Sequence, residues 1–154
     1  IKGARFINKI TVKNIEINNV VINNTNTSNA CVYANTTVTI DITGGSCTSS
    51  KYGILLDGGN ITVNADDYKI NASDYAIRFT SGSKHKLNLT DSEINKSENG
   101  VVGNYGIVNE SGVGNCSANI KDSYVSGKYY GVYVYSNNMT IENSTVTHTT
   151  TSIS

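Results

Sequence analysis

The stretch Tyr52-Gly53-Ile54-Leu55-Leu56 has close copies at four other places in the chain. The small residues Ala30, Gly53, Ala76, Gly106 and Gly131 of the five copies are separated by 23, 23, 30 and 25 residues. Repeats of this length indicate stacked structural units rather than one mixed core. The other copies are Ala30-Cys31-Val32-Tyr33, Tyr75-Ala76-Ile77-Arg78-Phe79, Tyr105-Gly106-Ile107-Val108 and Tyr130-Gly131-Val132-Tyr133-Val134.

Each copy is followed by a second alternating run and then by a third apolar position. The apolar residues recur with period two, as in Tyr52, Ile54 and Leu56, which predicts that these residues share one face of a strand. Gly, Asn, Asp and Ser bound the runs and supply turns. The second runs are Val38-Thr39-Ile40, Ile61-Thr62-Val63, Leu87-Asn88-Leu89, Ala118-Asn119-Ile120 and Met139-Thr140-Ile141, and the third positions are Cys47, Ile70, Ile94, Val125 and Val146.

One rung of three such strands cannot bury its inward row, but rungs stacked about 4.8 Å apart pair their backbone groups. We therefore expect an all-β fold, a single-stranded parallel β-helix of about six rungs, as one domain over residues 1–154. Residues 1–29 would form a degenerate first rung and loop, 30–146 the five repeats, and 147–154 a tail. A β-sandwich is the alternative, since it also has many short strands, but it lacks a recurring Tyr-Gly-Ile register.

The register predicts which side chains stack inward. One column contains Ile54, Ile77, Ile107 and Val132. In the degenerate rung, Phe6 falls in the first strand, Ile10-Thr11-Val12 in the second, and Ile17 at the third position. The other two columns are Ile61, Leu87 and Met139, and Ile70, Ile94, Val125 and Val146.

The composition excludes several classes of partner. Twelve basic residues balance twelve acidic ones, and no basic stripe is present, which argues against nucleic acid as a partner. No apolar run approaches the roughly 20 residues of a membrane-spanning helix, so we expect no membrane span and no signal peptide within these residues.

Sequons of the form Asn-x-Ser/Thr are about twice as frequent as chance predicts from 22 Asn and 34 Ser or Thr residues. Their excess predicts N-glycosylation and an extracellular or cell-surface location. The alternative is that Asn-rich turns beside Thr-rich strands create sequons without glycosylation. The outward or turn positions Asn23, Asn26, Asn60, Asn109 and Asn138 are the best candidates. The remaining sequons are at Asn35, Asn71, Asn88, Asn95, Asn115 and Asn143.

Two of the three cysteines fall on one rung. Cys31 aligns with the inward Ile54, and Cys47 aligns with the inward Ile70. The two cysteines either form a disulfide across the rung or remain as small buried apolar residues. Cys116 is left over and is either buried or paired between subunits. The spacing fits no zinc motif.

Catalytic chemistry has little support in the sequence. The acidic residues fall mostly at turns and corners, and Arg78 points outward with no carboxylate on its strand. His85 and His148 stand alone. Asp66-Asp67 beside Asn64 would suit calcium, but a solvated turn is the preferred reading. We therefore expect no catalytic residue, no metal and no cofactor. The acidic residues considered are Asp57, Asp66, Asp67, Asp74, Asp91 and Glu93.

Aromatic residues suggest a binding surface instead. Tyr133 and Tyr135 are expected to face outward beside Tyr129, because Val132 and Val134 face inward. Clustered exposed Tyr residues suit sugar stacking or protein contact. Ordinary strand-surface Tyr, favoured by β propensity, is the alternative.

The repeat Tyr-Gly-Ile … Ile-Thr-Val … Asp-Ser-x-Val resembles the right-handed β-helices of pectate-lyase-like surface proteins. It is most similar to adhesin-like proteins and extracellular carbohydrate-binding β-helices. The resemblance covers residues 30–146 and implies the fold, its right hand and an extracellular setting. No catalytic residue carries over, because the acidic and basic set of the enzymes is missing. The most typical passages are Asn119-Ile120-Lys121-Asp122-Ser123-Tyr124-Val125 and Thr140-Ile141-Glu142-Asn143-Ser144-Thr145-Val146.

Two functions follow as hypotheses. The first is a non-enzymatic, glycosylated subunit of a surface filament or layer, a homopolymer joined head to tail by strand addition. Its support is that Ile1–Val12 and Thr145–Ser154 are strand-prone and that neither end has a recognisable cap. The second is a carbohydrate-binding adhesin module that uses Tyr129, Tyr133 and Tyr135. An ice-binding surface, suggested by Thr37-Val38-Thr39, is disfavoured by the uneven rung lengths.

Overall fold

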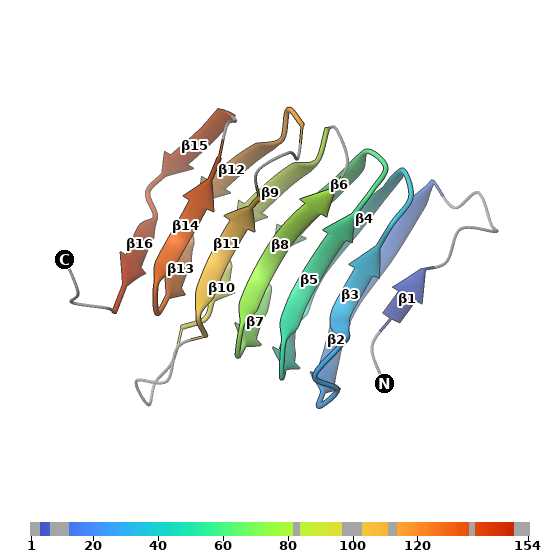
Figure 1. Ribbon diagram of the computed structural model, residues 1–154, viewed down its shortest axis with the longest axis horizontal. Coiled ribbons are helices and arrows are strands. Elements are labelled where there is room, and N and C mark those ends of the chain that lie inside the picture. The colour runs from blue at the N-terminus through green and yellow to red at the C-terminus, as the bar shows by residue number, and fades with distance from the viewer. Residues whose placement is uncertain are drawn as a thin grey trace.

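A computed structural model of the chain shows a stack of parallel strands (Figure 1). It describes the backbone of residues 4–6 and all atoms of residues 13–81, 84–96, 103–110, 114–135 and 138–149. Every regular element in these ranges is a strand. The strands are β1 (Ala4–Phe6), β2 (Asn14–Asn24), β3 (Ala30–Ala34), β4 (Val38–Ser49), β5 (Tyr52–Asp57), β6 (Ile61–Asp66), β7 (Lys69–Ala72), β8 (Tyr75–Ser81), β9 (Lys86–Thr90), β10 (Glu93–Ile94), β11 (Tyr105–Asn109), β12 (Ser117–Lys121), β13 (Tyr124–Gly127), β14 (Tyr130–Val134), β15 (Asn138–Glu142) and β16 (Thr145–His148).

The strands form two sheets that face each other across the core. The 6-stranded sheet has the order β1-β3-β5-β8-β11-β14. The 10-stranded sheet runs β15-β12-β9-β6-β4-β7-β10-β13-β16, and β2 pairs with β4. The strands β2 and β4 are long enough to pass round a corner, so each supplies both the second and the third strand of its rung. All pairs are parallel, which makes the fold a β-solenoid of about five turns, a small difference from the six rungs expected.

The first inward column is confirmed. Ile77 pairs in register with Ile54 and Ile107, and Ile107 pairs with Val132. The third column is confirmed in the same way, because Ile94 lies between Ile70 and Val125 and Val125 pairs with Val146.

The second column was assigned two residues out of register. Leu87 lies beside Val63 and Ala118, whereas Ile61 lies beside Val38. The corner before β9 has a different length from the corner before β6, so the first apolar residues of the two runs do not occupy equivalent positions. Met139 does belong to the Leu87 column, through Ala118.

The first rung also differs from the expectation. β1 ends at Phe6 as a first strand, but Ile17 pairs with Ile42 in the second strand, and Ile22 takes the third position beside Cys47. The segment Ile10–Val12 lies outside the described residues. Cys31 is also one residue out, because Val32 and not Cys31 pairs with Ile54.

The offset involves the second residue of the strands in the 6-stranded sheet, where Cys31 lies level with Gly53 and Gly53 lies level with Ala76. A Cβ atom on Gly53 would lie 2.4 Å from the carbonyl oxygen of Ala76, so only the smallest residues fit there. The strict alternation breaks at this position, and both Cys31 and Val32 are fully buried. The expectation that Tyr52 faces inward with Ile54 is therefore wrong, because its ring lies against Arg78 outside the core cluster.

A second corner depends on left-handed backbone. Once per rung, between the second and third strands, one residue has φ between 47° and 62°. Asn, Asp and Gly tolerate this conformation best, which explains the recurring Asp or Asn before Ser. The residues are Asn19, Gly44, Asp67, Asp91, Asp122 and Asn143.

Candidate functional site: the tyrosine face and the last rung

Tyrosines form a column along the 6-stranded sheet. Tyr52, Tyr75, Tyr105 and Tyr130 are the first residues of β5, β8, β11 and β14, so the stacking of rungs also stacks their rings. The ring centroids are 5.8 Å apart for Tyr52 and Tyr75, 4.7 Å for Tyr75 and Tyr105, and 6.1 Å for Tyr105 and Tyr130. Aromatic pairs at these distances attract each other. We call this row the tyrosine column.

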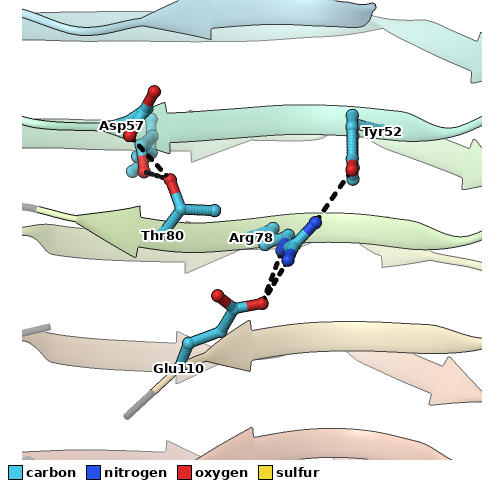
Figure 2. A network of polar contacts seen from close by, with 6 residues as sticks. Tyr52, Asp57, Arg78, Thr80 and Glu110 are labelled. Carbon is cyan, nitrogen blue, oxygen red and sulfur yellow. Dashed lines mark hydrogen bonds and ion pairs between the residues drawn. The ribbon is translucent and has the colours of Figure 1, made fainter. Parts of the chain in front are cut away.

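Arg78 ties the column to a carboxylate on the next rung (Figure 2). Its guanidinium lies 4.4 Å from the Tyr75 ring centroid, and Nη1 donates a 2.8 Å hydrogen bond to the Tyr52 hydroxyl. Nε donates to Glu110 Oε1 at 2.7 Å, and Nη2 also pairs with this oxygen. Burial opposes the charge of Arg78, but the hydrogen bond and charge of Glu110 outweigh it, so the pKa of Arg78 is raised.

Asp57 is the last residue of β5, whereas Tyr52, which bonds to Arg78, is the first residue of the same strand (Figure 2). Its carboxylate accepts hydrogen bonds from Thr80 Oγ1 at 3.0 Å, Ser81 Oγ at 2.7 Å and the Tyr33 hydroxyl at 3.2 Å. The bond from Ser81 contributes most to lowering the pKa of Asp57, against the effect of burial. These donors come from the strands on both sides of β5, so Asp57 links three rungs.

The tyrosine column becomes exposed towards its C-terminal end. Tyr129, Tyr130, Tyr133 and Tyr135 are between 40 and 61 % exposed and lie in or beside β14, the edge strand of the sheet. Ring contacts join Tyr130 to Tyr133 at 5.2 Å and Tyr105 to Tyr129 at 5.5 Å. Sequence reasoning proposed three of these residues and missed Tyr130, which it placed inward. The signal that identifies it is the small residue that follows each column tyrosine, because the alternation of inward and outward side chains breaks at that residue.

The last rung leaves inward apolar positions uncovered. Ile141 and Val146 are 46 and 38 % exposed, whereas their neighbours in the preceding rung, Ile120 and Val125, are 1 and 0 % exposed. The strands β14, β15 and β16 each stand at the end of their sheet, with one unpaired edge within the described residues.

The first rung is different. Ile17 and Ile22 occupy the same two columns there and are only 8 and 2 % exposed. Ile17 and Ile22 are therefore covered in the single chain, in contrast to Ile141 and Val146. In these two inward columns, the side chains of the last rung are exposed, whereas those of the first rung are buried.

The sequons fall into three groups by exposure. Asn95 and Asn109 are buried, so the expectation that Asn109 faces outward is wrong. Asn95 Nδ2 donates to the Tyr105 carbonyl and its Oδ1 accepts from the Ala72 N–H. Asn35 and Asn88 are partly buried, and Asn88 belongs to a ladder of side-chain amides with Asn64 and Asn119. The exposed sequons are Asn23, Asn26, Asn60, Asn71, Asn115, Asn138 and Asn143.

Two of the three cysteines form a disulfide bridge, and the third is buried outside it. Cys31 and Cys47 form a disulfide with a Cα–Cα distance of 6.2 Å across the rung that contains β3 and β4. Cys116 is buried and free of disulfides, and burial raises the pKa of its thiol.

The other candidate residues are dispersed. Asp67 and Asp91 occupy the left-handed corner, and Glu93 pairs with Lys69 and Lys96. The described residues contain no cluster of three His, Cys, Asp or Glu side chains that would hold a metal ion, and none of them forms a helix long and apolar enough to cross a membrane. His85 is buried and hydrogen-bonded, while His148 is exposed on β16. Asp66 ends β6, and Asp74 precedes β8.

Comparison with protein-family models, with curated proteins and with solved structures returned no match. Function therefore has to be inferred from the geometry of the chain itself.

Proposed function

We propose that the chain is a non-enzymatic, extracellular structural subunit, and that its last rung accepts the first rung of a second copy. The observation that carries this proposal is the exposure of Ile141 and Val146, which continue columns that are buried in every preceding rung. Apolar surface in such a position, bordered by unpaired strand edges, favours association with a further rung. Assembly of this kind is heterologous and forms an open filament unless the rotation closes a ring.

The first rung of a second copy has matching side chains. Ile17 and Ile141 belong to one inward column, and Ile22 and Val146 belong to another. When a second copy adds its first rung in the same register, Ile17 lies next to Ile141 and Ile22 lies next to Val146. In the outward-facing row next to these columns, Glu142 of the last rung corresponds to Asn18 of the first rung. Two like charges therefore do not meet at this position of the contact. The left-handed corner residues Asn143 and Asn19 also coincide. A second copy is therefore the occupant that fits without a change of register.

Assembly requires the first rung of the incoming copy to change, because its inward side chains are buried in the single chain. Ile17 and Ile22 are covered in the single chain, so this cover has to be displaced before they contact Ile141 and Val146. We therefore expect slow, concentration-dependent association with a lag, rather than rapid dimerisation.

Light scattering over a concentration series, followed by electron microscopy, tests the proposal. Ile141→Lys places a charge in the contact and is expected to keep the chain monomeric. Thr145→Lys is the matched control, since Thr145 is exposed on the same rung but belongs to the outward row, and it should assemble like the unmodified chain. A monomer at every concentration, or assembly of Ile141→Lys, would contradict the proposal.

An extracellular location is supported by the seven exposed sequons, whose positions leave room for glycans outside the core. Intact-mass spectrometry of material from its native source measures this directly. Glycopeptides at Asn60 or Asn138 are expected. The bare polypeptide mass would remove this support.

A second candidate function is glycan binding by a surface adhesin module. The observation that favours it is the joint exposure of Tyr129, Tyr130, Tyr133 and Tyr135 on and beside the edge strand β14. Screening a glycan array and measuring titrations with Tyr133→Ala tests it. Tyr124→Ala on the other sheet is the control. Saturable binding by a monomer that only Tyr133→Ala weakens would support this function, and no binding to any glycan would contradict it.

A further inference from the structure

The corner between the second and third strands is joined from rung to rung by serine hydroxyls. The Tyr68 N–H donates a 3.2 Å hydrogen bond to Ser92 Oγ, and the Ser92 N–H donates a 3.1 Å hydrogen bond to Ser123 Oγ. The Ser123 N–H donates in the same way to Ser144 Oγ, at 3.0 Å. Each of these backbone N–H groups therefore finds its acceptor in a side chain of the following rung. We call these positions the hydroxyl row.

The backbone of each serine's own rung fixes the direction of its hydroxyl. Each Oγ donates to the carbonyl oxygen two residues before it, at 2.8 Å for Ser92, 2.6 Å for Ser123 and 2.7 Å for Ser144. A hydroxyl has one proton and two lone pairs, so the lone pairs remain for the N–H of the preceding rung. An alkyl side chain at the same position would offer that N–H no acceptor.

The last rung has the donors of this corner without a following rung to receive them. In the rung before it, the Asp122 N–H donates to the Glu142 carbonyl at 3.1 Å. The equivalent donors of the last rung are the N–H groups of Asn143 and Ser144, and no further rung follows them among the described strands. The backbone carbonyl of any added rung can pair with the Asn143 N–H, but the Ser144 N–H needs a side-chain acceptor.

The first rung of the chain has an alkyl group in the hydroxyl row. Val20 directly follows the left-handed residue Asn19, in the way that each serine of the row follows its own corner residue. The φ angles of the first and last corners are 52° and 47°, so the side chains of Val20 and Ser144 start from the same backbone conformation. A second copy therefore continues the inward columns of the last rung but leaves the Ser144 N–H without an acceptor.

We propose that the last rung binds most tightly to a parallel rung that carries a hydroxyl at its corner, in which Asn or Asp is followed by Ser. Addition of a second copy then uses the same surface more weakly, and Val20 is the residue that weakens it. This inference rests on the proposed function, because both concern the contact surface of the last rung.

Val20→Ser adds the missing hydroxyl to the first rung of the full chain. Light scattering over a concentration series is expected to show assembly at a concentration roughly two- to tenfold lower than for Val20→Ala, which corresponds to one net hydrogen bond per contact. Val20→Ala is the matched control, because both variants remove the same partly buried apolar side chain and only one supplies a hydroxyl. Assembly of both variants at the same concentration would overturn the inference and leave the proposed function in place.

A synthetic peptide with the sequence of residues 117–127 gives a second measurement that does not require assembly. The peptide has the corner of the preceding rung, including the Ser123 hydroxyl. Its Lys121 belongs to the same row as Glu142 of the last rung and has the opposite charge, which favours addition in register. The matched control is the same peptide with Ser123→Ala.

Hydrogen exchange of two neighbouring amides then separates binding from recognition of the hydroxyl. At a chain concentration below the onset of scattering, the unmodified peptide is expected to slow exchange of both the Asn143 and the Ser144 amides. The Ser123→Ala peptide should protect the Asn143 amide, whose acceptor is a backbone carbonyl, but not the Ser144 amide. Equal protection of the Ser144 amide by the two peptides would overturn the inference alone. Protection of neither amide, together with no assembly of any variant, would overturn both the inference and the proposed function.

Discussion

The last two rungs of the β-solenoid carry nearly the same residue pattern but differ in burial. Ile120 and Val125 are core residues, whereas Ile141 and Val146 are exposed, although each pair lies in the same columns. The difference depends only on whether a further rung follows. An inward position in a repeat is therefore a potential core residue, and the neighbouring rung decides whether it is buried.

The largest expected effect separates these two rungs. Ile120→Asp, like Ile77→Asp in the middle of the stack, is expected to unfold the chain, because an unpaired buried charge costs several kcal/mol of a total stability of about 5–15 kcal/mol. Ile141→Asp should remain folded, since water already reaches its side chain. Far-UV circular dichroism and urea midpoints measure both. A folded Ile120→Asp variant with an unchanged midpoint would show that the register is wrong.

The disulfide is expected to make the two ends of the stack unequal in stability. Replacing Cys31 and Cys47 by Ala removes a cross-link that spans 16 residues and should cost roughly 3 kcal/mol. The rungs near β3 and β4 are expected to lose hydrogen-exchange protection, while β15 and β16 change little. Cys116→Ala is the control, because Cys116 forms no disulfide. Equal losses of protection at both ends would show that the cross-link has no local effect.

The sequence predicted the parts of this fold that depend on repetition. Ile54, Ile77 and Ile107 could be placed in one column because the same motif surrounds each of them. Ile61 could not be placed correctly relative to Leu87, because the corner before β9 differs in length from the corner before β6. Tyr52 was misplaced for another reason, since the alternation fails at Gly53, where the closely packed backbone of the next rung leaves no room for a side chain.

Contacts between rungs were beyond sequence reasoning. Glu110 lies 32 residues from Arg78, and nothing in the local pattern identifies it as the partner. Asn109 was expected outside, because Asn usually is, yet it takes an inward position level with Phe79. Within the side chain of Asn109, neither the amide nitrogen nor the amide oxygen has a hydrogen-bond partner.

A buried and an exposed sequon asparagine are expected to contribute differently to the free energy of unfolding. This smaller difference tests the hydrogen bonds that join neighbouring rungs. Asn95→Ala removes a donor to the Tyr105 carbonyl and an acceptor for the Ala72 N–H. Leaving two buried backbone groups unsatisfied should cost about 1–3 kcal/mol for each. Asn71→Ala changes an exposed sequon side chain on β7 and should leave the denaturation midpoint nearly unchanged. Equal midpoints for the two variants would contradict the role of Asn95 as a link between rungs.

The smallest expected effect concerns the carboxylate of Asp57, which accepts hydrogen bonds from the rungs on both sides of its own. Hydrogen bonds from Ser81, Thr80 and Tyr33 hold the pKa of Asp57 below its ordinary value of 3.8, although burial opposes them. A lowered pKa in the folded chain means that the unfolded chain takes up the proton first as the pH falls. The contribution of Asp57 is therefore complete above pH 3.8 and is lost as the pH falls through the lower pKa of the folded chain. Asp57→Asn should abolish this part of the acid sensitivity in urea midpoints measured across that window. Glu142→Gln in the last rung is the control, because no further rung of the chain follows it among the described strands. Identical acid profiles for Asp57→Asn and the unmodified chain would show that the three-rung link at Asp57 does not stabilise the folded state.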